Sequence, residues 1–172
     1  MHAADYDSST YKGDDDDDNG NGNGNGNNDN NGNGGDNQNY LEVTANTNLS
    51  FTCSSPQQLE NTQTLPNAIS LKFKTKSSDC SVYAKISAFN KPSAANFSDF
   101  KLYLDWTNDN SQNAQQKLQD PVLLTMTDQR LFVQPKKSQA FHFDYNLQLG
   151  AMGYEAPAGQ YTYTILFTMT QP

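Results

Sequence analysis

Apolar and polar side chains alternate along most of residues 40–172. Between Ile69 and Lys76, for example, Ile69, Leu71 and Phe73 fall on one side of an extended chain, and the lysines fall on the other. A period of two indicates β-strands that are buried on one face. The same pattern predicts strands over 80–86, 100–106, 141–149 and 161–170, with further strands within 40–53 and 122–133, the latter with a turn near Asp128.

These segments amount to about eight strands, separated by polar or proline-containing turns such as Lys91-Pro92-Ser93 and Ala156-Pro157-Ala158-Gly159. No window shows a convincing helical period, apart from a weak and polar one over Ser111–Leu118. Half-buried strands with turns at this spacing are typical of two antiparallel sheets packed face to face. The sequence therefore predicts an all-β fold, an antiparallel immunoglobulin-like β-sandwich formed by residues 40–172.

Residues 1–39 have a different composition. They contain nine Asp and one Lys, which gives a net charge of −8, whereas the ten acidic and ten basic residues of 40–172 cancel. A segment rich in Asp, Asn and Gly cannot bury enough apolar surface to offset the cost of ordering its backbone, so we expect a disordered tail before one folded domain. The neutral domain argues against nucleic-acid binding through a basic face. The absence of an apolar run approaching ~20 residues argues against a transmembrane segment.

The tail contains partial matches to a calcium-binding loop. Asp15, Asp17, Asn19 and Gly20 occupy positions 1, 3, 5 and 6 of the EF-hand pattern, in which oxygen ligands and a glycine turn hold the ion. The twelfth position, where a bidentate Glu is needed, is Gly26. The partial match recurs from Asp29 and Asn31. We favour a solvated spacer, with weak calcium binding as the alternative, and expect no other cofactor.

The chain contains two cysteines, Cys53 and Cys80, each at the edge of a predicted strand. In an otherwise cysteine-free β domain they favour one disulfide that links the first strand to a neighbour, with two buried free thiols as the alternative. A disulfide implies an oxidising compartment. The start of the sequence has no positively charged region and no apolar signal core, and the domain favours an exported protein whose signal has been removed.

Candidate catalytic chemistry is sparse. His142 alternates with Phe141 and Phe143, which indicates an outward-facing histidine on a strand rather than a general base. The sequence contains no nucleophile elbow, no zinc-binding helix motif and no phosphate-binding glycine loop. We therefore expect a protein that is not an enzyme.

Three aromatic side chains suggest sugar binding as an alternative function. Trp106, together with Tyr103 and Tyr83, could form a platform for a sugar ring, as in a carbohydrate-binding module. Trp106 is also in phase with Leu102 and Leu104, which favours a position in the core. Both interpretations stay open on the sequence alone.

The C-terminal segment is a Pro157-Ala158-Gly159 turn followed by a Thr-rich strand up to Thr170. It resembles the last strand of exported bacterial pilin-type sandwiches, in particular the spore coat U family and the chaperone–usher subunits. The latter carry a glycine at the place of Gly159, fourteen residues from the C-terminus, and the early cysteine pair is similar to their single disulfide. Two features differ: Gln171 stands in place of a penultimate tyrosine, and residues 1–39 lack the apolar alternation of a donor strand.

The resemblance implies a pilin-like fold and assembly by strand addition, in which an extension of one subunit completes the next. The N-terminal candidate for such a strand is formed by Tyr40, Leu41, Val43 and Ala45, and it fits an ordinary first strand at least as well. We expect an exported structural or adhesive protein of the periplasm, cell surface or extracellular space. Its most specific form would be a fibre subunit that assembles with itself or with related subunits, and a secreted carbohydrate-binding module is the alternative.

Overall fold

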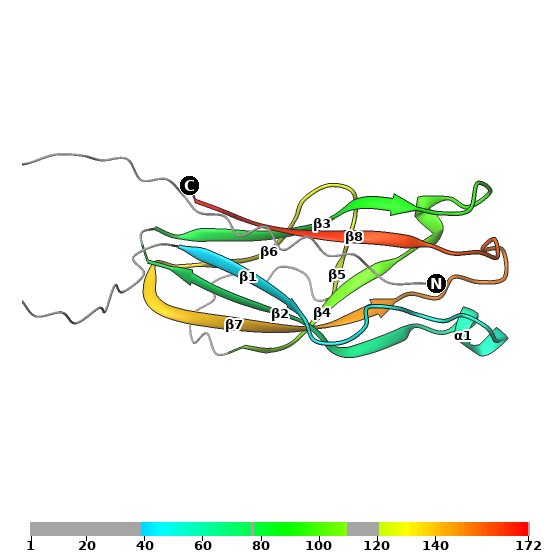
Figure 1. Ribbon diagram of the computed structural model, residues 1–172, viewed down its shortest axis with the longest axis horizontal. Helices are drawn as coiled ribbons and strands as arrows, with labels where there is room; N and C mark the ends of the chain where they lie inside the picture. Colours follow the sequence, from blue (N-terminus) through cyan, green and yellow to red (C-terminus); the bar gives the residue numbers. More distant parts are fainter. Residues whose placement is uncertain (1–38, 77, 110–120, 172) are drawn as a thin grey trace, which may run out of the picture.

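The computed structural model describes residues 39–76, 78–109 and 121–171, which form two antiparallel sheets packed face to face (Figure 1). The larger sheet has the order β1-β2-β7-β4-β5, with the bounds Tyr40–Ala45, Gln63–Thr75, Lys137–Leu149, Leu102–Asp109 and Val122–Leu123. The smaller sheet has the order β6-β3-β8, with the bounds Gln129–Gln134, Cys80–Asn90 and Thr162–Thr170. The predicted all-β sandwich is confirmed.

The strand order follows the immunoglobulin arrangement in both layers. In that arrangement strands A, B, E and D form one sheet, and strands C, F and G form the other. Here β1, β2, β7 and β4 take the places of A, B, E and D, while β3 and β8 take the places of C and F. β6 is an additional strand beside β3, and no strand in the described part of the chain occupies the place of G beside β8.

A cluster of three phenylalanines joins the two sheets. Phe73 of β2 and Phe143 of β7 come from the larger sheet, Phe132 of β6 comes from the smaller one, and all three are 0% exposed. The ring centroids of Phe132 and Phe143 are 4.1 Å apart, and the centroid of Phe73 lies 5.0 Å from that of Phe132. Because burying one aromatic side chain removes about 150–250 Å² from water, this cluster contributes strongly to the packing of the layers.

The segment after β1 differs from the sequence prediction, which continued strand structure towards Cys53. β1 ends at Ala45, and the buried side chains of Leu49 and Phe51 lie outside any strand. The hydroxyl of Tyr163 on β8 donates a hydrogen bond to the carbonyl oxygen of Leu49 at 3.0 Å. The segment therefore fills part of the core beneath β8 instead of extending a sheet.

A single helical turn, α1 (Pro56–Glu60), follows this segment, although the periodicity of the sequence does not predict it. The Ser55 side chain accepts a hydrogen bond from the Gln58 N–H, and the Gln58 side chain accepts one from the Ser55 N–H in return. This capping box and the proline at the start of the turn are signals of a helix beginning, whereas five residues are too few to show a period. The described residues contain no helix that is long and apolar enough to cross a membrane.

β2 is longer than predicted because it continues through a β-bulge. The alternating pattern begins at Ile69, since Pro66 interrupts it, yet β2 begins before the proline. The register with β7 shifts between Leu65 and Ile69, and Asn67 in the bulge has a φ of 47°. The Asn67 N–H donates to the side-chain oxygen of Asn146 on β7 at 2.9 Å, so a side chain replaces the backbone partner where the ladder is interrupted.

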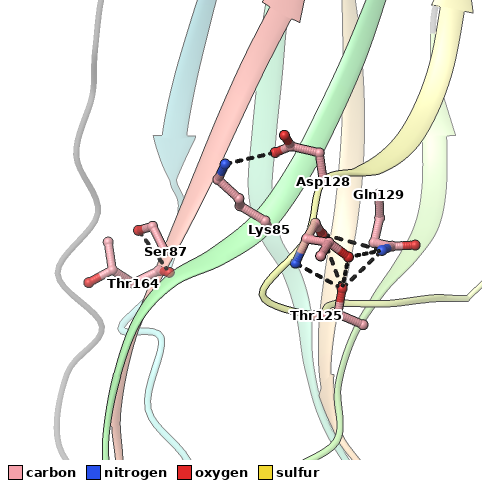
Figure 2. Close-up of polar contacts among 7 residues, drawn as sticks. Lys85, Ser87, Thr125, Asp128, Gln129 and Thr164 are labelled. Carbon is pink, nitrogen blue, oxygen red and sulfur yellow. Dashed lines mark hydrogen bonds and ion pairs between the residues drawn. The ribbon is translucent and has the colours of Figure 1, made fainter.

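The segment between β5 and β6 crosses from the larger sheet to the smaller one. The Leu124 N–H donates to the carbonyl oxygen of Leu102 at 2.8 Å, and the carbonyl oxygen of Thr125 accepts from the Ile86 N–H on β3 at 2.8 Å. The hydroxyl of Thr125 accepts a further hydrogen bond from the Gln129 side-chain amide at 2.9 Å (Figure 2). The strands predicted in this region are therefore divided between the two sheets.

Candidate functional site

β8 is an edge strand of the smaller sheet. It pairs with β3 in a register that places Leu166 opposite Lys85 and Thr168 opposite Tyr83, and no other strand in the described ranges pairs with it. On its other side, in the place of strand G, no described strand lies beside it, and we call this side the open edge. A nine-residue edge of this kind presents a row of backbone groups that can bind a further strand.

The direction of the backbone groups along β8 follows from β3. The Ile86 N–H donates towards the segment that leads into β6, on the side of β3 away from β8. Because successive residues of a strand direct their backbone groups to opposite sides, those of Lys85 point to β8 and meet Leu166. The Ser87 hydroxyl on β3 donates to the carbonyl oxygen of Thr164 at 3.4 Å (Figure 2). The Thr164 carbonyl group therefore points to β3, as does that of Leu166 two residues later. The backbone groups that point to the open edge of β8 are therefore those of Tyr163, Ile165, Phe167 and Met169.

β8 is the least protected of the four edge strands described. The segment Thr162–Thr170 contains neither a charged residue nor a proline. Among the other edges, β1 carries Glu42, β6 carries Arg130, and β5 has two residues and follows Pro121. Charge, proline and short length are common means by which edge strands avoid pairing with other molecules. β8 has none of these, so its edge is the candidate functional site.

The inward-facing side chains of β8 are already buried by other parts of the same chain. Ile165 and Phe167 are 3% and 6% exposed. β1 lies near β8 in the other layer and pairs with β2 of the same chain (Figure 1). It contains the residues considered above as a donor strand, Tyr40, Leu41, Val43 and Ala45. In this structure they form the first strand of their own sheet, and the open edge of β8 offers backbone hydrogen bonds rather than an apolar groove.

The disulfide predicted between Cys53 and Cys80 is not formed, and both thiols are free. The Cys53 sulfur accepts a hydrogen bond from the side-chain amide of Gln63, at the beginning of β2, whereas Cys80 begins β3 after the far end of β2. The thirteen residues of β2 separate these positions by a distance on the order of 40 Å, and a disulfide needs Cα atoms within about 7 Å. Burial raises the pKa of the Cys80 thiol above its ordinary value.

Trp106 and Tyr103 lie on opposite faces of β4. Trp106 packs against the core, opposite the buried Tyr145 of β7, whereas Tyr103 is in phase with Asp105 on the outer face. Tyr83 alternates with buried residues of β3 and so lies on the outer face of the smaller sheet. The structure therefore does not bring the three aromatic side chains to one surface.

The outer face of the larger sheet carries hydrogen-bonded polar side chains that sequence analysis missed. Asp105 accepts hydrogen bonds from the side-chain amides of Asn146 at 3.0 Å and Gln148 at 2.7 Å. The half-exposed His142 lies on the same face of β7, as its alternation predicts, with its Nε2 atom 3.9 Å from a carboxylate oxygen of Asp144. These residues come from strands far apart in the sequence, so the pairing of β4 with β7 is what brings them together.

The residues considered as calcium ligands, Asp15, Asp17, Asn19, Asp29 and Asn31, lie outside the described part of the chain. Within the described part, no group of three or more His, Cys, Asp or Glu side chains could hold a metal ion. The polar window predicted at 111–118 also lies outside these residues.

Comparison of the chain with models of protein families, with curated proteins and with solved structures found no match.

Proposed function

We propose that this protein is an exported, non-enzymatic structural or adhesive surface protein that associates with its own copies or with related subunits through the open edge of β8. The observation that carries the proposal is the edge of this nine-residue strand, which has no charge and no proline and pairs on that side with no strand in the described part of the chain. A segment of high β-propensity without charges is the kind that adds to another strand when it is left exposed. Residues 1–39, with their net charge of −8, would then act as a charged spacer.

The energetics indicate how strong such an association can be. The four residues whose backbone groups point to the open edge supply one N–H and one C=O each, which allows up to about eight hydrogen bonds of roughly 0.5–1.5 kcal/mol. Their sum, about 4–12 kcal/mol, is comparable to the roughly 4–15 kcal/mol that association costs in lost freedom of motion. Backbone pairing alone is therefore weak, and the side chains beside it decide whether two copies stay together.

The introduction of two lysines into β8 tests the proposal. Thr164 and Thr168 lie half-buried on the outer face of β8, and the double substitution Thr164→Lys and Thr168→Lys gives this edge the charges that it lacks. We expect self-association of the full chain, measured by sedimentation over a concentration series, to become at least tenfold weaker. The matched control places the same charges on the central strand β3, as Ser81→Lys and Ser87→Lys, and should associate like the wild type. Equal association of wild type and the β8 variant would remove the basis of the proposal.

The outer face of the larger sheet favours glycan binding as a second candidate. Tyr103 lies on this face opposite Gln148, beside the carboxylate of Asp105, and aromatic rings next to amide and carboxylate groups suit a sugar. In calorimetric titrations with a panel of oligosaccharides, Tyr103→Ala should abolish any saturable binding, because its ring would be the platform. Trp106→Phe, in which an aromatic side chain still faces the core, should bind as the wild type does. Binding that survives Tyr103→Ala, or its absence from the wild type, would rule out this site.

A further inference from the structure

We propose that the partner of the β8 edge is β8 of a second copy, paired antiparallel about a two-fold axis that passes through Leu166. This inference rests on the proposed function and names its partner. Leu166 is the midpoint of Thr162–Thr170, so this register pairs the strand over its full length. The result is a continuous six-stranded sheet with the order β6-β3-β8-β8-β3-β6. It closes on itself, because each copy uses the same surface.

The sequence of β8 is self-complementary in this register. On the outer face, Thr162 meets Thr170 of the second copy, Thr164 meets Thr168, and the two Leu166 side chains meet at the axis. On the inner face, the isoleucine meets a phenylalanine and the tyrosine meets a methionine. Thr–Thr pairs and pairs of aromatic with aliphatic side chains are favourable across antiparallel strands, and no two charges are opposed. These contacts supply the side-chain contribution that backbone pairing alone lacks.

The backbone phase of β8 also suits the two-fold arrangement. The backbone groups of Leu166 are directed to β3, so the two Leu166 residues form a non-hydrogen-bonded pair with Cα atoms about 4.5 Å apart. Ile165 and Phe167, whose groups point to the open edge, come opposite each other and exchange both hydrogen bonds. Other registers of this pair oppose different residues and leave one end of β8 without a partner.

The lysine next to this interface does not oppose the pairing. Lys85 lies opposite Leu166 on β3, and its Nζ atom forms an ion pair with Asp128 at 3.2 Å (Figure 2). In the six-stranded sheet the two Lys85 residues are three strand spacings apart, about 14 Å. This exceeds the screening length of about 8 Å at physiological ionic strength, so their repulsion is small.

Cysteine cross-linking tests the register directly. In the full chain with Cys53→Ser, so that the buried Cys80 is the one remaining native thiol, Leu166→Cys should form an intermolecular disulfide on mild oxidation. The expected Cα separation lies within the range that a disulfide accepts. Thr164→Cys and Thr168→Cys should each stay uncross-linked alone and should cross-link when mixed, because only the mixture opposes the two positions. Equal cross-linking of every variant with itself would overturn the two-fold register.

A charge exchange provides a second test that does not depend on oxidation. Thr164→Glu with Thr168→Lys opposes unlike charges across the axis twice, whereas lysine at both positions opposes like charges. We expect the Glu/Lys variant to dimerise at least tenfold more tightly than the Lys/Lys variant in sedimentation experiments. If both variants lose association equally and Leu166→Cys does not cross-link, the edge is used but its partner is another strand. If neither variant changes association, the proposed function fails together with this inference.

Discussion

Replacing Phe132 by alanine is expected to lower the free energy of unfolding by about 3–5 kcal/mol. Phe132 is the residue of the smaller sheet whose ring stacks on Phe143 and contacts Phe73, and all three are fully buried. The substitution removes apolar area from the interface of the two layers and leaves a cavity that neighbouring rings cannot fill without losing their own contacts. Because domains of this size are stable by about 5–15 kcal/mol, the loss is a large part of the total.

Urea denaturation monitored by fluorescence measures this change. Leu123→Ala serves as the control, because Leu123 on the short edge strand β5 is 41% exposed. Its truncation should lower the free energy of unfolding much less than Phe132→Ala does. A loss below about 1 kcal/mol for Phe132→Ala would show that the two layers are not joined through this cluster. The reversibility of unfolding should be checked at low protein concentration, since association through β8 would add to the apparent stability.

The protein is expected to lose stability steeply above about pH 10, and Tyr163 is expected to cause part of that loss. Burial raises the pKa of Tyr163 above its ordinary value of about 10. Above that pH the unfolded chain releases the phenol proton while the folded protein keeps it. The folded state then binds more protons, so its stability falls as pH rises, by up to about 1.4 kcal/mol per pH unit for this one group. Below pH 10 the group is protonated in both states and contributes no pH dependence.

Tyr163→Phe separates this contribution from the rest of the alkaline transition. At neutral pH the variant should be less stable by about 1 kcal/mol, because the carbonyl oxygen of Leu49 loses the hydrogen bond that the Tyr163 hydroxyl donates. Above pH 10 its stability should fall less steeply than that of the wild type. Urea midpoints between pH 8 and 12 give both slopes, and an ultraviolet titration should show one fewer late-ionising tyrosine. Identical slopes would contradict the burial of the Tyr163 phenol.

Most strands could be predicted from the sequence because the fold buries one face of each. On β7, for example, the alternation from Phe141 to Leu149 agrees with the observed burial at every position. The elements that sequence analysis missed are those whose formation depends on local hydrogen bonds or on a neighbouring strand. α1 is too short for a period and depends on the Ser55 cap, and the first part of β2 is held by the Asn67–Asn146 hydrogen bond across a bulge. Alternation also gives no information on which sheet a strand joins, as the segment between β5 and β6 shows.

The candidate site, too, could be predicted from the sequence only in part. The sequence predicts that residues 161–170 form an uncharged strand, but it does not show that this strand lies at an edge, because that depends on which strands pair. The prediction of a disulfide was wrong for a related reason. Cys53 and Cys80 each lie near the end of a predicted strand, and only the path of β2 shows that these ends are on opposite sides of the sandwich. The polar row with Asp105 and Asn146 is likewise a product of strand pairing.

The most direct test of the account is amide hydrogen exchange along β8, measured by NMR on dilute and concentrated samples of the full chain. In dilute protein, the amides of Leu166 and Thr168 should be protected by β3, while those of Ile165 and Phe167, which point to the open edge, should exchange much faster. At high concentration the Ile165 and Phe167 amides should become protected as well, because a second strand then binds them. Equal and unchanged exchange of all four amides at every concentration would contradict the claim that this edge is a site of association.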